Sequence, residues 1–126
     1  MILDSNIIIY ASTPDYPELL LYLKEHESDL RVSSVAKLEV LGYHKLQVEE
    51  KEFLENFFMT IPILSISESI IERAILLKQQ RKMSIGDSII AATGLLNNLP
   101  IFTDNEDDFK DIENLNVITL KEIVNK

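Results

Sequence analysis

The stretch Met1-Ile2-Leu3-Asp4-Ser5-Asn6 carries a short apolar run directly into a carboxylate. A strand that begins at the N-terminus is most economically a central strand, so we expect residues 1–6 to form the middle of a sheet. Asp4 then lies at the carboxyl end of this strand, where open α/β sheets place their functional sites. The simpler interpretation is that Asp4 caps the next helix. The choice depends on whether other acids join it.

The chain has 126 residues and no cysteine. This length fits one domain spanning residues 1–126, and the lack of cysteine argues against a disulfide scaffold or a Cys-ligated metal site. No basic segment followed by a long apolar core precedes the first predicted strand, and no apolar run approaches the roughly 20 residues of a membrane span. We therefore expect a soluble cytoplasmic protein with no membrane partner.

The formal net charge of −9 is unevenly distributed. Such a charge argues against binding nucleic acid by bulk electrostatics, which needs many Lys and Arg contacts to phosphate. A nucleic-acid substrate would require metal ions or a local basic patch, and the compact basic group is Lys78, Arg81 and Lys82. Negative charge is concentrated in one stretch that holds Asp104, Glu106, Asp107, Asp108, Asp111 and Glu113.

Segments with strand and helix patterns alternate along the chain. Strands are predicted at 1–6, 30–33, 60–65, 100–103 and 117–118, and helices at 7–11, 18–26, 35–46, 49–59, 67–81, 85–96 and 120–125. Ser34 and Thr119 are the expected N-caps of the third and last helices, and Pro62 places its strand at a beginning or an edge. This alternation favours a single-domain three-layer α/β/α sandwich with a central, mainly parallel sheet.

Two acids lie on apolar parts of their predicted helices. At about 100° per residue, Glu39 falls about 40° from Val35, inside the apolar arc of the predicted helix 35–46. Burying an unpaired carboxylate costs several kcal/mol, so Glu39 is in an ion pair, at a crevice edge or in a site. Asp87 lies on a predicted helix that is apolar almost all round. Ser84-Ile85-Gly86-Asp87 also matches a capping box, which leaves an oxygen free for a cation.

The acidic run that starts at Asp104 follows the predicted strand 100–103, as Asp4 follows the first strand. For most of this run a solvated helix start is the simpler interpretation, because carboxylates suit the positive end of a helix dipole. Several acids at one rim still need compensation, since two charges 4 Å apart repel by roughly 4 kcal/mol at an effective dielectric near 20. An all-oxygen ligand set suits Mg²⁺ or Mn²⁺, the usual tools of phosphoryl chemistry. The predicted reaction class is metal-assisted phosphodiester hydrolysis.

Four segments, in this order, resemble a PIN domain of the VapC toxin type. They are ILDSNIIIYA at 2–11, Val32-Ser33-Ser34 leading to Glu39, IGDSIIAA at 85–92, and FTDN at 102–105 with the Asp108-Phe109 pair. The resemblance implies a PIN-like fold and an Mg²⁺- or Mn²⁺-dependent endoribonuclease. It also implies the toxin of a type II toxin-antitoxin pair, neutralised by a small antitoxin protein and often a homodimer.

The resemblance also assigns residues. Asp4, Glu39 and Asp87 match the three core acids and are expected to hold the metal, with Ser5 and Asn6 fixing Asp4 by hydrogen bonds. The fourth catalytic position is Asn105, where some members have Asp; Asp104, Asp107 or Asp108 could replace it, and Thr103 supports the rim. From charge placement alone, Arg81 and Lys82 are expected to guide the RNA backbone.

Two other classes remain. A PIN-like module without catalysis, acting through a protein partner, is compatible with Asn105 and the net acidity. A receiver-like phospho-acceptor domain has similar length and alternation, but the predicted strand 60–65 ends in Ser65-Ile66-Ser67, which offers no acceptor aspartate.

Overall fold

The computed structural model describes residues 1–124, and all of its strand pairs are parallel. β1 (Ile2–Leu3), β4 (Ile101–Thr103) and β5 (Val117–Thr119) form one sheet, and β2 (Val32–Ser33) pairs with β3 (Ile63–Leu64). A parallel bridge between Ile2 and Arg31 joins the two, with Leu3 N–H donating to the Arg31 carbonyl at 3.0 Å. The strand order is β3-β2-β1-β4-β5. The predicted central position of the first strand is therefore confirmed.

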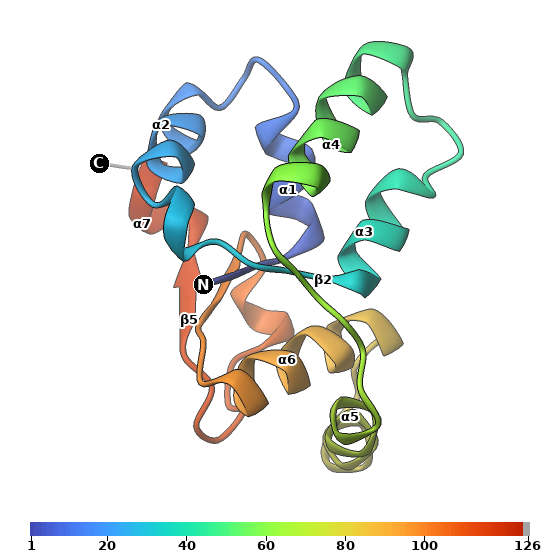
Figure 1. Cartoon of the computed structure of the whole chain (residues 1–126). Helices are drawn as coiled ribbons and strands as arrows, with labels where there is room; N and C mark the ends of the chain where they lie inside the picture. Colours follow the sequence, from blue (N-terminus) through green and yellow to red (C-terminus); the bar gives the residue numbers. More distant parts are fainter. Residues whose placement is uncertain (125–126) are drawn as a thin grey trace.

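Helices cover both faces of this sheet (Figure 1). One face carries α1 (Ser5–Ala11), α2 (Pro17–Glu25), α3 (Ser34–Leu41), α4 (Val48–Thr60) and α7 (Leu120–Val124), and the other carries α5 (Glu68–Gln80) and α6 (Ile85–Asn97). Two 3₁₀ turns, η1 (Glu27–Asp29) and η2 (Glu106–Asp108), complete the described chain. The three-layer α/β/α architecture is as predicted. The predicted last helix reached residue 125, which lies outside the described residues.

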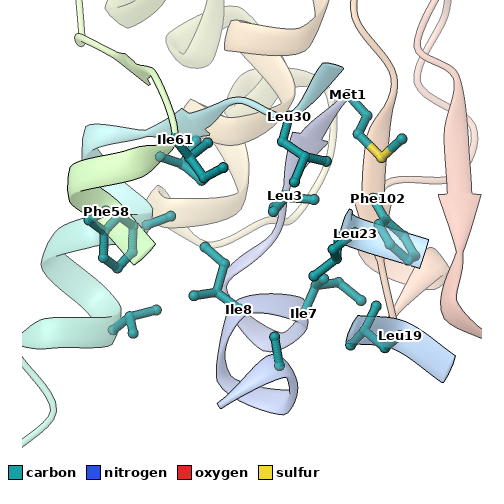
Figure 2. Packing of buried hydrophobic residues seen from close by; sticks show 14 of the residues in the cluster. Met1, Leu3, Ile7, Ile8, Leu19, Leu23, Leu30, Phe58, Ile61 and Phe102 are labelled. Atoms are coloured by element: carbon teal, nitrogen blue, oxygen red, sulfur yellow. The ribbon is translucent and has the colours of Figure 1, made fainter. Parts of the chain in front are cut away.

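Alternating side chains of the strands build a separate core on each face. Leu3 and Phe102 point to the side of α1 and α2, where Ile7 and Leu19 surround them (Figure 2). Ile2, the neighbour of Leu3 in β1, packs with α6 on the other side. All of these side chains are fully buried, and each contributes about 1.5–3 kcal/mol through removal from water. This burial fixes the strand ends, and hence the position of Asp4.

The third helix is shorter than predicted. It ends at Leu41 instead of residue 46, with Gly42 as its C-cap and Ser33, not Ser34, as its N-cap. Glycine costs about 1 kcal/mol relative to alanine inside a helix, so the helix stops where Gly42 follows. The expectation for Pro62 is confirmed, because it directly precedes β3, whose pairing in the described residues is with β2 alone. No helix within residues 1–124 combines the length and hydrophobicity that crossing a membrane requires.

Candidate active site

Asp4 lies where the strand order reverses. The chain runs from β1 through β2 to β3 on one side, then returns to β4 on the other side of β1. Ligand sites of open parallel sheets occur at the carboxyl ends of strands flanking such a reversal. Asp4 follows the end of β1, and Thr103 ends the adjacent β4.

Asp4 is held rigidly at this edge. Its side chain is 5% exposed; Oδ1 accepts from the backbone N–H of Ser5 at 2.8 Å, and Oδ2 accepts from the Thr103 hydroxyl at 2.7 Å. It is also the N-cap of α1, so the cap interpretation is correct and compatible with a site. Burial raises the pKa of Asp4, the two hydrogen bonds oppose this, and the negative charges of Glu39 and Asp108 raise it further.

Glu39 reaches the same place from α3. Its Oε1 accepts from the Ser5 hydroxyl at 2.7 Å, and its Oε2 lies against the backbone of Gly86, where an added Cβ would be only 2.5 Å away. The predicted apolar arc around Glu39 is wrong, because Glu39 is exposed and its neighbour Leu38 is 71% exposed. Glu39 is a crevice-edge acid, which the sequence left open as one alternative.

Asp87 lies in the first turn of α6. Its backbone N–H donates to the Ser84 hydroxyl at 3.1 Å, so Ser84 is the N-cap as the capping pattern indicated. The following run of α6 is buried, as its all-round apolar pattern predicted. Burial raises the pKa of Asp87 from 3.8 to about 6, together with the charges of Asp4, Asp108 and Glu39 and against the Ser84 hydrogen bond. The four carboxylates are therefore close enough to affect one another.

The structure brings Asp108 of η2 to the other acids. Asp108 raises the pKa of both Asp4 and Asp87. Asn105 has an exposed side chain, and its backbone N–H donates to the Thr103 hydroxyl at 3.0 Å.

The other acids of this loop bind elsewhere. Asp104 accepts from the Tyr10 hydroxyl at 3.0 Å and Asp107 pairs with Lys110 at 3.1 Å. Asn6 was expected to fix Asp4, but its described hydrogen bond is from the Asp104 N–H at 3.3 Å.

Arg81 and Lys82, the two residues predicted to guide the RNA backbone, line a cavity beside the acids. This cavity of about 480 Å³ is lined by Arg81, Lys82, Met83, Ser84, Asp87 and Asp108. Lys82 is exposed, whereas the Arg81 guanidinium donates to the backbone carbonyls of Lys110 and Asp107. The site thus combines carboxylates with one free-standing lysine at its rim.

Residues 1–115 match the PIN domain family. The chain belongs to this family. Similar solved structures include a toxin-antitoxin complex from Klebsiella pneumoniae, with 29% identity, a TM-score of 0.77 and coverage of 94% of this chain and 95% of that one. VapBC-1 from nontypeable Haemophilus influenzae has 25% identity, a TM-score of 0.72 and coverage of 94% and 96%.

DNA-bound VapBC from Salmonella typhimurium shares the fold at 16% identity, with a TM-score of 0.81 and coverage of 94% and 96%. No curated protein sequence matches the chain. The resemblance to VapC-type PIN domains is confirmed by these similarities.

The donor set of this PIN domain fits a hard divalent cation. In residues 1–124, the ion pairs are Lys110–Asp107 and Lys121–Glu106, so neither neutralises the acids around Asp4. All four side chains offer carboxylate oxygens, which Mg²⁺ and Mn²⁺ prefer. Within those same residues, no three His, Cys, Asp or Glu side chains are placed so that they could hold a metal ion as they stand. Asp4, Glu39 and Asp87 are the residues that would hold the ion, with Asp108 beside them.

Three supporting residues of the PIN domain escaped the sequence analysis or received no defined role there. Gly86 leaves the space that the Glu39 carboxylate occupies, and Tyr10 reaches Asp104 from α1. Thr103 was expected only to support the rim, yet it donates directly to Asp4. A glycine in the first turn of an otherwise apolar helix is the one available signal, because glycine there costs stability.

Proposed function

We infer that this protein is a divalent-metal-dependent endoribonuclease, a hydrolase of RNA phosphodiester bonds, and the toxin of a toxin-antitoxin pair that acts in the cytoplasm. The observation that carries this proposal is the gathering of Asp4, Glu39, Asp87 and Asp108 at one sheet edge, where no cationic side chain of residues 1–124 pairs with them. Burial raises the pKa of Asp4 and Asp87, and the mutual repulsion of the acids raises both further. A bound cation relieves this repulsion.

Each residue has a defined task in this proposal. Asp4, Glu39 and Asp87 bind Mg²⁺ or Mn²⁺, with Asp108 completing the rim in place of Asn105. A bound ion supplies activation of a water molecule and stabilisation of the charge that develops on the phosphate. Ser5 and Thr103 hold the carboxylate of Asp4 in one orientation through the hydrogen bonds described above.

The RNA backbone approaches along the cavity beside Asp87. Lys82 is exposed on its rim and provides a positive charge for a phosphate, which suits a nucleic-acid site in a chain with a net charge of −9. Asp87 must be ionised to bind a cation, and with a pKa of about 6 it is mostly ionised at neutral pH. This arrangement supports hydrolysis at or above neutral pH.

Cleavage of single-stranded RNA by the purified chain tests the proposal. We expect cleavage with Mn²⁺ or Mg²⁺, its loss with EDTA, and its loss in Asp4→Asn and Asp87→Asn variants that remain folded. Glu113→Gln is the matched control, because Glu113 is an exposed acid of the same acidic stretch. If both variants cleave like the wild type, the assignment is wrong. If the wild type cleaves nothing under these conditions, the chain is a non-catalytic PIN-like module.

The partner of this toxin is a small antitoxin protein, as in the similar toxin-antitoxin complex named above. A groove of about 480 Å³ between α2 and α4 has apolar walls formed by Leu20, Leu23, Leu30, Phe53, Phe57 and Ile61. An apolar segment of the antitoxin suits this groove. Phe53 is 38% exposed and is the residue to test. Phe53→Asp should abolish co-purification of the chain with its antitoxin, without changing RNA cleavage.

The chain also forms a homodimer in this proposal. Leu38 on α3 and Ile85 at the start of α6 are 71% and 68% exposed, and they flank Glu39 and Gly86 in the sequence. Because the Glu39 carboxylate lies against Gly86, the two segments are adjacent, and clustered exposed apolar side chains are typical of protein interfaces. Light scattering should give a dimer for the wild type and a monomer for Leu38→Glu; a monomeric wild type would contradict this part.

A further inference from the structure

Arg81 joins the end of α5 to the segment that carries Asp108. It is the C-cap residue of α5; its Nη1 donates to the backbone carbonyl of Lys110, and its Nη2 donates to that of Asp107 at 3.2 Å. In the chain, these two carbonyls flank Asp108 and Phe109. Because both acceptors are backbone atoms, the guanidinium fixes the path of the main chain around Asp108.

The Asp108 segment has little regular structure to fix it otherwise. η2 is a single 3₁₀ turn, in which Asp108 N–H donates to the Asn105 carbonyl at 3.1 Å. Such turns have poorer hydrogen-bond geometry than α-helices. The chain after it takes a left-handed conformation at Asp111, with φ of 64°. Phe109, 1% exposed, anchors the segment in the core, Lys121 of α7 binds Glu106 of η2 at 2.8 Å, and Arg81 adds an attachment from α5.

The other end of this connection is also fixed. Lys78 on α5 donates from Nζ to the Met83 carbonyl at 2.7 Å, which ties down the connector that leads into α6. α5 and α6 pack along each other, and Asp87 lies in the first turn of α6. Residues at the end of α5 therefore bind two segments that line the cavity: the connector before Asp87 and the segment around Asp108.

We propose that Arg81 is a positioning residue that holds Asp108 against Asp87 by clamping the backbone on both sides of Asp108. This inference rests on the proposed function, because it assumes that Asp108 helps to hold the cation. It gives Arg81 a task other than contact with RNA. Loss of the guanidinium removes the attachment on both sides of Asp108, so its effect on cation binding should resemble that of losing Asp108 itself.

A double-mutant cycle on Mn²⁺ affinity, measured without RNA from the spectrum of free Mn²⁺, tests the clamp. Arg81→Ala and Asp108→Asn should each weaken binding about tenfold, and the double variant should be no weaker than Asp108→Asn. Removing a positive charge beside carboxylates by itself strengthens cation binding, so weaker binding by Arg81→Ala requires the clamp. Arg73→Ala, on the same helix, is the matched control. Wild-type affinity of Arg81→Ala or Asp108→Asn, or additive losses, would overturn the proposal.

Amide hydrogen exchange of the metal-free protein separates this inference from the proposed function. We expect the amides of Phe109 and Lys110 to exchange faster in Arg81→Ala than in wild type or Arg73→Ala, while the amides of α6 keep their protection. Unchanged exchange would overturn the clamp even if RNA cleavage is established. If Arg81→Ala exchanges faster at these amides but the wild-type protein binds no Mn²⁺, the clamp is supported and the metal-dependent function is rejected.

Discussion

Replacing Gly86 by alanine should separate catalysis from stability in this protein. A Cβ at this position would lie 2.5 Å from Oε2 of Glu39 and 3.2 Å from its carboxyl carbon. The oxygen must therefore retreat by about 0.9 Å to reach an ordinary contact of 3.4 Å. Because the obstacle is the far end of a flexible side chain, the main chain of α6 can stay in place.

The expected effects on activity and stability have opposite signs. A displacement of about 1 Å at a catalytic group costs on the order of 100-fold in rate, so kcat/KM for RNA should fall by about that factor. Alanine is the better helix former by up to about 1 kcal/mol, and Gly86 lies inside the first turn of α6. The free energy of unfolding should therefore be unchanged or slightly higher.

Gly94→Ala is the matched control on the same helix. A Cβ there would lie 2.8 Å from Cδ1 of Ile101 and 3.0 Å from the carbonyl oxygen of Leu99. Overpacking of this kind costs about 1–3 kcal/mol, so this variant should lose stability while each folded molecule keeps its activity. The assays are single-turnover cleavage with Mn²⁺ and denaturant unfolding. Wild-type activity in Gly86→Ala, or its failure to fold, would refute the placement of Glu39.

The remaining predictions concern protonation and orientation of the acids. The folded protein binds the Asp87 proton more tightly than the unfolded chain between pH 3.8 and about 6, so stability falls as pH rises through this window. Asp87→Asn should therefore stabilise the metal-free protein at pH 7, by roughly 1 kcal/mol after solvent screening, as urea unfolding will show. In the wild-type protein, kcat/KM should fall about tenfold per pH unit below pH 6, as Asp87 becomes protonated. Mn²⁺ should raise the melting temperature at pH 7.5 more than at pH 5, which differential scanning fluorimetry checks; an equal rise contradicts ligation by Asp87. Thr103→Val should weaken Mn²⁺ binding about tenfold whereas Thr103→Ser should not, because the lost group is the hydroxyl that donates to Asp4.

The sequence predicted the sheet and its centre because those features depend on local patterns. An apolar run ending in Asp4 indicated a central strand, and Pro62 indicated the start of an edge strand. The end of α3 was missed because an apolar periodicity extended past Gly42, which stops the helix. A break by one glycine outweighs a continuing pattern when the residues beyond it are exposed, as they are at 43–45.

The acids of the candidate site could be picked out from the sequence, whereas the contacts that position them could not. Asp4, Glu39 and Asp87 stand out by type and position, although the argument for burying Glu39 was wrong. The contact between Glu39 and Gly86 joins segments 47 residues apart, and no local pattern encodes it. The same holds for Asp108, whose approach depends on how η2 is folded and attached. Which of the acids after Thr103 lies near the other carboxylates could be learned only from the folded structure.

Anomalous diffraction at the manganese edge from crystals soaked in Mn²⁺ tests the central claim most directly. The account predicts a peak bounded by the carboxylates of Asp4, Glu39 and Asp87, with Asp108 beside it, and no such peak in crystals of folded Asp4→Asn. A soaked wild-type crystal with no peak there, or with Mn²⁺ bound only to the exposed acids of the stretch that begins at Asp104, would contradict it.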